Sequence, residues 1–237
     1  TGALSFIAAP NFEAPSDADS DNVYEVTVQA SDGAFNDTQA ISVTVTAVND
    51  NTPVITSNGG GATGSVSIAE NTSAVTSVAA TDADLPAQTL TYSIAGGADA
   101  AKFSINGSTG ALSFVAAPNF EAPADANADN VYQVTVRASD GSLSDTQAIS
   151  VTVTAVNDNT PVITSNGGGA TASVSIAENT NAVTTVTATD ADLPAQTLSY
   201  SIAGGADQAL FSVNGVTGVL SFNTAPDFEA PADAGAN

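Results

Sequence analysis

Carboxylate side chains recur at fixed places along this chain, in short motifs that return after about 108 residues. The motifs read IAEN, TDAD, NFE or DFE, and ASDG. Their acids are Glu70 and Glu178, Asp82 and Asp84, Asp190 and Asp192, Glu13, Glu121 and Glu229, and Asp32 and Asp140. Hard oxygen ligands in this number suit Ca²⁺, which takes about six to eight oxygens in flexible geometry, better than Mg²⁺ with its strict octahedron.

A polar, proline-terminated segment, AVNDNTP, lies at residues 47–53 and again at residues 155–161. Each copy falls where the last strand of one repeat is expected to meet the first strand of the next. Loops gather at the two ends of a β-sandwich, so acids of successive repeats should face each other across this linker. Two carboxylates about 4 Å apart repel by roughly 4 kcal/mol at an effective dielectric constant near 20. The sequence therefore predicts a bound cation at each joint.

The same residue types give little support to catalysis. The chain contains no His and no Cys, and it has no G-x-S-x-G nucleophile motif. Paired carboxylates can cleave glycosides when they face each other in a cleft, but these acids recur with the repeat and lie at its joints. We therefore expect a protein that is not an enzyme.

The elements that must position these acids are short β-strands. In residues 131–139 the side chains of Tyr132, Val134 and Val136 alternate with polar residues, as a half-buried strand requires. Similar stretches separated by Gly, Pro and Asp give about seven strands per repeat. The pattern predicts an all-β fold, an antiparallel sandwich with immunoglobulin-like Greek-key connections, and very little helix.

The amino-acid composition restricts the kinds of partner that the chain can bind. Two basic residues stand against 25 acidic ones, so the net charge is −23 and binding to nucleic acid or to an anionic membrane surface is disfavoured. No apolar run approaches the length of a membrane span, so we expect no membrane insertion in this segment. The absence of Cys excludes disulfides and thiolate ligands for zinc.

The string NDNTP, together with AEN, TDAD, (N/D)FE and ASDG in order, resembles the calcium-binding signature of cadherin repeats. These motifs, as they stand in this chain, are similar to those of the bacterial cadherin-like tandem repeats of large surface adhesins. The resemblance implies cadherin-like sandwiches arranged as an extended rod. It divides the chain into the C-terminal part of one repeat at residues 1–48, a complete repeat at 49–156, and the N-terminal part of another at 157–237.

The resemblance also implies which residues bind the ions. For the first joint these are Asn11, Glu13, Asn49, Asp50, Asn51, Asp82, Asp84 and Asp140. For the second joint they are Glu70, Asn119, Glu121, Asn157, Asp158, Asn159, Asp190 and Asp192, and the copies Glu178, Asp227 and Glu229 continue the series. Asn159 would contribute its main-chain carbonyl. The acid of ASDG in the preceding repeat is Asp32.

Two departures from the family pattern reduce the expected charge of these sites. The linker opens with Ala47 and Ala155 where the family usually has Asp. Asn11 and Asn119 stand two residues before the NFE glutamate, and only Asp227 keeps an acid there. Affinity for Ca²⁺ follows the charge of the ligands, so we expect weaker binding, with two or three ions per joint.

These features predict a calcium-rigidified, extracellular stalk segment of a cell-surface adhesion or biofilm-type protein, whose partners are the neighbouring repeats of the same chain. The alternative is a self-associating filament or homophilic adhesion module, in which other copies of the chain are the partners. This alternative arises because neither the first nor the last part of the chain contains all the strands of a sandwich.

A second kind of acidic loop places acids at alternate positions, as Asp17, Asp19 and Asp21 and as Asp125, Asn127 and Asp129. It is similar to the first half of an EF-hand loop but lacks that loop's Gly and terminal Glu. A metal site and a solvated acidic turn both remain open for these loops.

Overall fold

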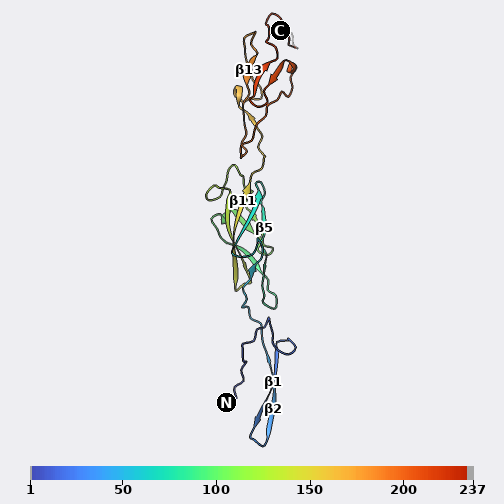
Figure 1. Cartoon of the computed structure of the whole chain (residues 1–237). Coiled ribbons are helices and arrows are strands. Elements are labelled where there is room, and N and C mark those ends of the chain that lie inside the picture. Colours follow the sequence, from blue (N-terminus) through green and yellow to red (C-terminus); the bar gives the residue numbers. More distant parts are fainter. Residues whose placement is uncertain (1, 234–237) are drawn as a thin grey trace. The chain divides into compact units, whose positions relative to one another are not determined.

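The computed structural model describes residues 2–233, and the chain divides into two units. Unit 1 is Thr1–Thr154 and unit 2 is Ala155–Asn237. Figure 1 shows the path of the chain through both units, and each is described by itself below.

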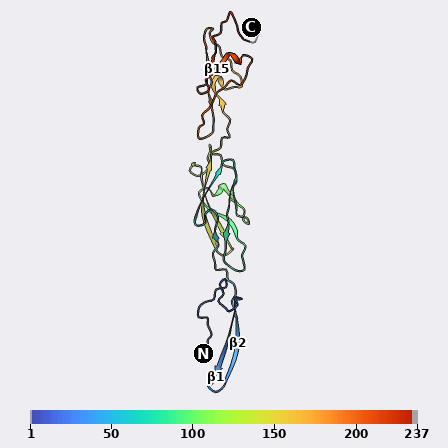
Figure 2. The same cartoon turned by 45° about the vertical axis from the view of Figure 1, so that its right-hand side comes forward.

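Unit 1 begins with a strand pair and continues with a complete sandwich, which we call the middle repeat. The strand pair is β1 (Val23–Ser31) and β2 (Asn36–Thr44), seen as two adjacent arrows in Figures 1 and 2. The strands of the middle repeat are β3 (Val54–Ile55), β4 (Thr63–Ala69), β5 (Ala74–Ser77), β6 (Ala80–Thr81), β7 (Thr91–Gly96), β8 (Phe103–Ile105), β9 (Ala111–Phe114), β10 (Val131–Ser139) and β11 (Ser144–Thr154). A short 3-10 helix, η1 (Ala100–Lys102), precedes β8.

The middle repeat has two main sheets, which confirms the predicted all-β sandwich. One sheet has the strand order β4-β11-β10-β7, and the other has the order β5-β9-β8, with the short pair β3-β6 beside them. The expectation of purely antiparallel pairing was wrong for one ladder, because β11 pairs with β4 in parallel. These strands lie at the two ends of the repeat's sequence and no hairpin joins them, so no tight turn forces them to run in opposite directions.

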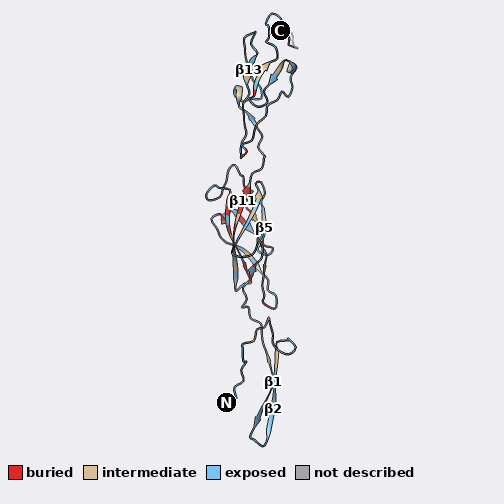
Figure 3. Ribbon diagram, in the orientation of Figure 1, coloured by how far each residue is buried: buried red, intermediate tan, exposed pale blue. Residues whose placement is uncertain are grey.

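The core lies between these sheets, as the alternation of side chains predicts. Tyr132, Val134 and Val136 of β10 are buried, and so are Ile149 and Val151 of β11. The ring of Tyr132 meets Phe114 edge to face with centroids 4.9 Å apart, and Phe114 stacks on Phe103 at 4.4 Å. In the described part of the chain every buried hydrophobic side chain falls between Ile55 and Val153, and Figure 3 shows most of the buried residues, in red, in the middle repeat.

Unit 2 contains β12 (Val162–Ile163), β13 (Ala182–Thr185), β14 (Ala188–Thr189), β15 (Phe211–Val213) and β16 (Val219–Phe222), with two 3-10 helices, η2 (Ser165–Gly167) and η3 (Gln208–Leu210). These strands form a three-stranded sheet, β13-β16-β15, and the pair β12-β14. Residues 171–177 and 199–204 are copies of β4 and β7 but are not in strands. β4 and β7 pair with β11 and β10, and the described part of unit 2 holds no copy of those two strands. Residues 171–177 and 199–204 therefore have no such neighbouring strand among the described residues with which to form a ladder of hydrogen bonds.

The described helices are single 3-10 turns, and none is long or apolar enough to cross a bilayer.

The TGALSF motif allows one prediction about the core. Leu112 is 2% exposed, whereas its copy Leu4 is 54% exposed. Leu112→Ala should therefore lower the free energy of unfolding of the middle repeat by about 2–5 kcal/mol, since it leaves a cavity in a packed core. Leu4→Ala is the matched control and should change it by less than about 0.5 kcal/mol. Thermal and urea unfolding followed by circular dichroism measure both, and equal losses would contradict this placement of the core.

Candidate metal centre

Three carboxylates converge at one end of the middle repeat. Asp82 and Asp84 follow directly on β6, and Asp140 follows directly on β10. One oxygen from each side chain lies within 4.8 Å of the other two. The structure thus brings together acids from TDAD and ASDG that are more than fifty residues apart in the sequence.

The linker residues hold Asp84 in place. The backbone N–H of Asn51 donates to Asp84 Oδ1 at 3.1 Å, and the Asn51 side-chain amide donates to the same oxygen at 2.8 Å. The N–H of Asp50 adds a longer contact of 3.4 Å. Asp84 is only 2% exposed, yet the hydrogen bond from the Asn51 side chain, with the backbone donors, outweighs burial and holds the pKa of Asp84 below its usual value. The carboxylate is therefore ionised at neutral pH.

Asn49 completes a group of oxygens that face one another. Its Nδ2 donates to Gln88 Oε1 at 2.8 Å, which leaves its Oδ1 3.3 Å from Asp84 Oδ2 and 3.1 Å from Asp140 Oδ2. All three atoms are acceptors, so no hydrogen bond can form between them in this orientation. Either a cation lies among these oxygens, or the amide rotates and donates to both carboxylates.

Asp82 is the fourth residue of this group of facing oxygens. Its Oδ1 accepts from the N–H of Asp84 at 3.0 Å, but within the described residues its Oδ2 is buried and has no hydrogen-bond partner. A buried carboxylate oxygen without a donor is costly. A hard cation ligated by this oxygen, Asp84, Asp140 and the Asn49 carbonyl would remove that cost, so the donor set fits Ca²⁺.

The glutamate of the preceding repeat reaches the same loop. Glu13 Oε1 accepts from the N–H of Leu85 at 3.4 Å, directly after the TDAD motif. Asn11, in contrast, is occupied within its own turn, where its Oδ1 accepts from the N–H of Glu13 at 2.9 Å. The structure brings Glu13 next to the three-carboxylate group and leaves Asn11 beside Glu13.

Burial and backbone hydrogen bonds have opposite effects on the pKa of Asp140. Desolvation disfavours its charged form, but the N–H groups of Leu143 and Ser142, both 2.7 Å from Oδ1, outweigh that effect and lower its pKa. Asp32, its copy in the first part of the chain, makes the same turn with the N–H groups of Ala34 and Phe35. Asp32 is exposed and belongs to none of the acid groups found among the described residues, so here the structure shows a turn residue.

The other end of the middle repeat brings the two predicted glutamates together. Glu70 is 2% exposed, and its Oε2 accepts from the N–H of Phe120 at 2.8 Å. An oxygen of Glu70 lies within 4.8 Å of an oxygen of Glu121. Asn119, two residues before Glu121, accepts from the N–H of Ala122 at 2.9 Å. Two carboxylates thus meet where the loops after β4 and β9 approach each other.

Unit 2 reproduces the linker geometry of unit 1. Asp192 is 1% exposed, and its Oδ1 accepts from the N–H of Asn159 at 3.0 Å and from the Asn159 amide at 2.8 Å. This side-chain amide holds the pKa of Asp192 below its usual value. The N–H of Asp158 also points to Asp192, and Asp190 accepts from the N–H of Asp192. Asp192 Oδ2 is buried and has no hydrogen-bond partner among the described residues.

Two further details of unit 2 repeat those of unit 1. The Asn157 amide donates to Gln196, as that of Asn49 donates to Gln88. Glu178, Asp227 and Glu229 form an exposed group with oxygens within 4.8 Å, and Glu178 Oε2 accepts from the N–H of Phe228 at 3.1 Å. The glutamines are the residues that the sequence analysis missed. Their recurrence 39 residues after the linker Asn in both copies was the available signal.

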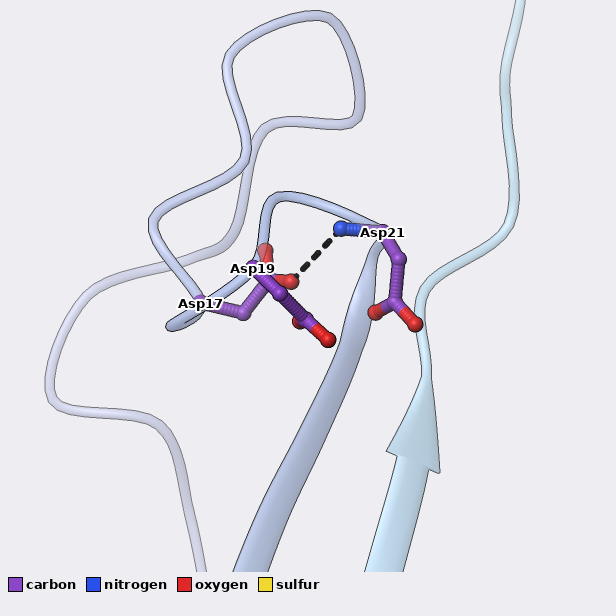
Figure 4. A group of neighbouring side chains, drawn as sticks. All are labelled: Asp17, Asp19 and Asp21. Carbon is purple, nitrogen blue, oxygen red and sulfur yellow. Dashed lines mark hydrogen bonds between the residues drawn. The ribbon is translucent and has the colours of Figure 1, made fainter.

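The alternate-acid loops differ from each other. Oxygens of Asp17, Asp19 and Asp21 lie within 4.8 Å, and Asp17 Oδ2 accepts from the N–H of Asp21 at 2.8 Å (Figure 4). In the copy, Asp125 is largely buried and both its oxygens accept backbone N–H groups, from Asp129 and Asn130. Asp125 therefore has the bonding of a turn residue.

A buried acid outside all the motifs anchors this second loop. Asp99 is 4% exposed, and its two oxygens accept from the N–H groups of Ala126 and Gln133, each at 2.7 Å. It ties the loop at 125–129 to the start of β10. The sequence gives no sign of this role, because the partners lie about thirty residues away.

Known proteins are similar to this chain in sequence. The family model described as "Cadherin domain" matches residues 64–154. Human Protocadherin Fat 1 is 34% identical over 229 residues, which is 92% of this chain and 5% of that protein. The chain therefore spans about a twentieth of this curated relative.

Solved structures give the same result for the fold. The extracellular cadherin domains 3–6 of Protocadherin Gamma B2 are 27% identical with a TM-score of 0.55, covering 88% of this chain and 52% of that one. Mouse Protocadherin-24 EC1-3 is 25% identical with a TM-score of 0.60, covering 92% of this chain and 70% of that one. Residues 64–154 thus match the cadherin-domain model in sequence, and the fold is similar to that of solved cadherin domains.

Proposed function

We propose that the chain is a calcium-binding, extracellular adhesion segment in which ions stiffen the joints between successive cadherin-like repeats. The observation that carries this proposal is the convergence of acceptor oxygens around Asp82, Asp84 and Asp140, one of them buried and without a donor. Ca²⁺ is the cation of choice because it accepts many carboxylate and carbonyl oxygens in irregular geometry.

At the first joint the ligands would be the three aspartates, Glu13 and the Asn49 side chain, with Asp50 and Asn51 shaping the linker. The repeat extends this assignment to the second joint, where the proposed ligand set is Glu70, Asn119, Glu121, Asn157, Asp158, Asn159, Asp190 and Asp192. Glu178, Asp227 and Glu229 would serve a further joint of the same kind. Support comes from the matching hydrogen bonds on Asp84 and Asp192.

Metal binding of this kind would couple to order. Each ion would draw together the linker and the acids of two repeats, whose charges otherwise repel, so it would turn a flexible string of domains into a stiff rod. Extracellular calcium modules bind at about 10⁻⁴–10⁻³ M, which suits a segment that stiffens only outside the cell. We propose repeat boundaries at residues 1–48, 49–156 and 157–237, and a context in a large bacterial surface adhesin.

The proposal includes no catalytic role, because the acids recur with the repeat and hold the linker in place. Self-association as a filament or homophilic module is the second candidate. Protocadherin gammaB7 EC3-6, a cis-dimer structure, is 27% identical with a TM-score of 0.57 over 92% of this chain and 54% of that one.

The ASDG motif provides a matched test of calcium binding. Asp140→Asn removes one charge from the proposed first joint, so the calcium dissociation constant of that joint should rise about tenfold or more, since affinity follows ligand charge. Asp32→Asn makes the same change in the same turn away from any acid group and should leave binding unchanged. Isothermal titration calorimetry of the three proteins measures this. Equal calcium affinities for all three proteins would contradict the assignment of Asp140 as a calcium ligand.

Stiffening can be measured by small-angle scattering. Chelation of calcium should change the radius of gyration of the wild-type chain, because joints without ions bend freely. The double variant Asp84→Asn with Asp192→Asn should lose this response, whereas Asp32→Asn should keep it. If calcium and chelator both leave the radius of gyration of the wild-type chain unchanged, the rod proposal is wrong.

A further inference from the structure

The side-chain amide of Asn49 has different neighbours on its two sides. On one side lies the Gln88 side chain, whose Oε1 is 2.8 Å from the Asn49 amide nitrogen. On the other side lie one carboxylate oxygen of Asp84 and one of Asp140, at 3.3 and 3.1 Å from the second polar atom of the same amide. The Asn49 amide therefore connects the proposed calcium ligands to Gln88, a residue outside the acidic motifs.

Each orientation of this amide suits a different state of the site. When its nitrogen points to Gln88, its oxygen faces two carboxylate oxygens, and this arrangement favours a cation among them. When the amide is turned over, its nitrogen donates to both carboxylates, and its oxygen lies 3.3 Å from Gln88 Nε2, which is a donor. The second orientation satisfies the carboxylates of Asp84 and Asp140 without a metal ion.

Gln88 can bond to the amide in both orientations, because its own side chain carries an acceptor oxygen and a donor nitrogen. A carboxylate at this position could only accept, and an apolar side chain could do neither. Asn49 is exposed, so its amide can turn over without moving the core. Unit 2 has the same pair, since the Asn157 amide donates to Gln196. The pairing is therefore a feature of the repeat.

We propose that Asn49 and Gln88 form a two-state switch. In the closed state the Asn49 amide donates to Asp84 and Asp140, and in the open state its carbonyl faces them and a divalent cation binds. This inference rests on the calcium binding proposed above and adds its control. In the closed state the amide hydrogens take the place of the cation, so the carboxylates keep a donor when the site is empty.

The apparent calcium affinity then depends on the fraction of molecules in the open state. A cation binds only the open state, so its apparent dissociation constant rises as that fraction falls. The hydrogen bond from Asn49 Nδ2 to Gln88 Oε1 is made in the open state and favours it. Gln88 is thus a positioning residue, which acts on the cation through Asn49.

Two substitutions of Gln88 separate this switch from a merely structural role. Gln88→Met keeps a long, unbranched side chain but removes the strong acceptor and the donor, so the closed state should dominate. The calcium dissociation constant of the first joint should rise about fivefold or more, because the hydrogen bond that favours the open state is lost. Without calcium the melting temperature of the middle repeat should stay within about 1 °C of the wild-type value, because the carboxylates keep their donor.

Gln88→Glu should have the opposite effect. The new carboxylate can only accept, so it holds the Asn49 nitrogen and keeps the Asn49 carbonyl toward Asp84 and Asp140. Calcium should bind at least as tightly as to the wild type. Without calcium the facing oxygens have no donor, so the melting temperature should fall by about 3 °C or more. Thr89→Glu is the matched control, because it adds the same charge at the next residue, which is exposed, and measures the effect of charge alone.

Isothermal titration calorimetry gives the dissociation constants, and thermal unfolding in chelator, followed by circular dichroism, gives the melting temperatures. The switch predicts a crossed result, in which Gln88→Met loses affinity and keeps stability, and Gln88→Glu keeps affinity and loses stability. A Gln88→Met protein with wild-type affinity, or one that loses affinity and stability together, would overturn the switch. So would a Gln88→Glu protein that matches Thr89→Glu in both measurements.

Nuclear magnetic resonance measures the orientation of the amide directly. In the wild-type chain, the coupling across the hydrogen bond from Asn49 Nδ2 to the Gln88 side-chain carbonyl should be present with calcium and absent with chelator. The signals of the Asn49 amide are identified by their loss in Asn49→Ala. A coupling that calcium does not change would contradict the two states.

The switch and the calcium proposal can be told apart when they fail. A wild-type chain that binds no calcium would overturn both. A wild-type chain that binds calcium and loses affinity in Asp140→Asn, but whose Gln88 variants show no crossed result, would overturn the switch alone.

Discussion

The packing of β10 and β11 against the other strands is the interaction on which the middle repeat depends. These two strands pair with β4 on one side and β7 on the other, and their inward side chains form most of the buried core. Among the described residues of unit 2, which include no copy of this pair, segments of nearly the same sequence as β4 and β7 are not in strands. The structure of those segments is thus a property of their partners, because a strand's hydrogen bonds are made to another segment.

The same strands place the acids. Asp140 stands at the end of β10, and β6 ends at the TDAD motif, so closing the sandwich brings three carboxylates within 4.8 Å. Folding therefore creates a concentration of negative charge, on a chain whose net charge is already −23. Linker N–H groups and the Asn51 amide keep Asp84 ionised in spite of its burial. A divalent cation would complete this design by offsetting the repulsion that the fold imposes.

The proposed calcium binding depends on the polar ends of the sandwich, where loops from different strands meet. Near identity of the copies makes the same arrangement possible at each joint, because the acids and the linker asparagines recur at the same places in the repeat.

The sequence by itself was enough to predict the repeat, the all-β class and the inward residues of β10. These features are local, because the alternation of apolar and polar residues within one segment reports which side chains are buried. The grouping of Asp82, Asp84 and Asp140 at one joint came from the resemblance to cadherin repeats, because Asp140 lies far from the other two acids in the chain. Only the tertiary structure decided the parallel pairing of β4 with β11, the anchoring role of Asp99 and the contact between Asn49 and Gln88. Each of these joins residues far apart in the chain, and the pattern of a single segment holds no information about which distant segment will lie beside it.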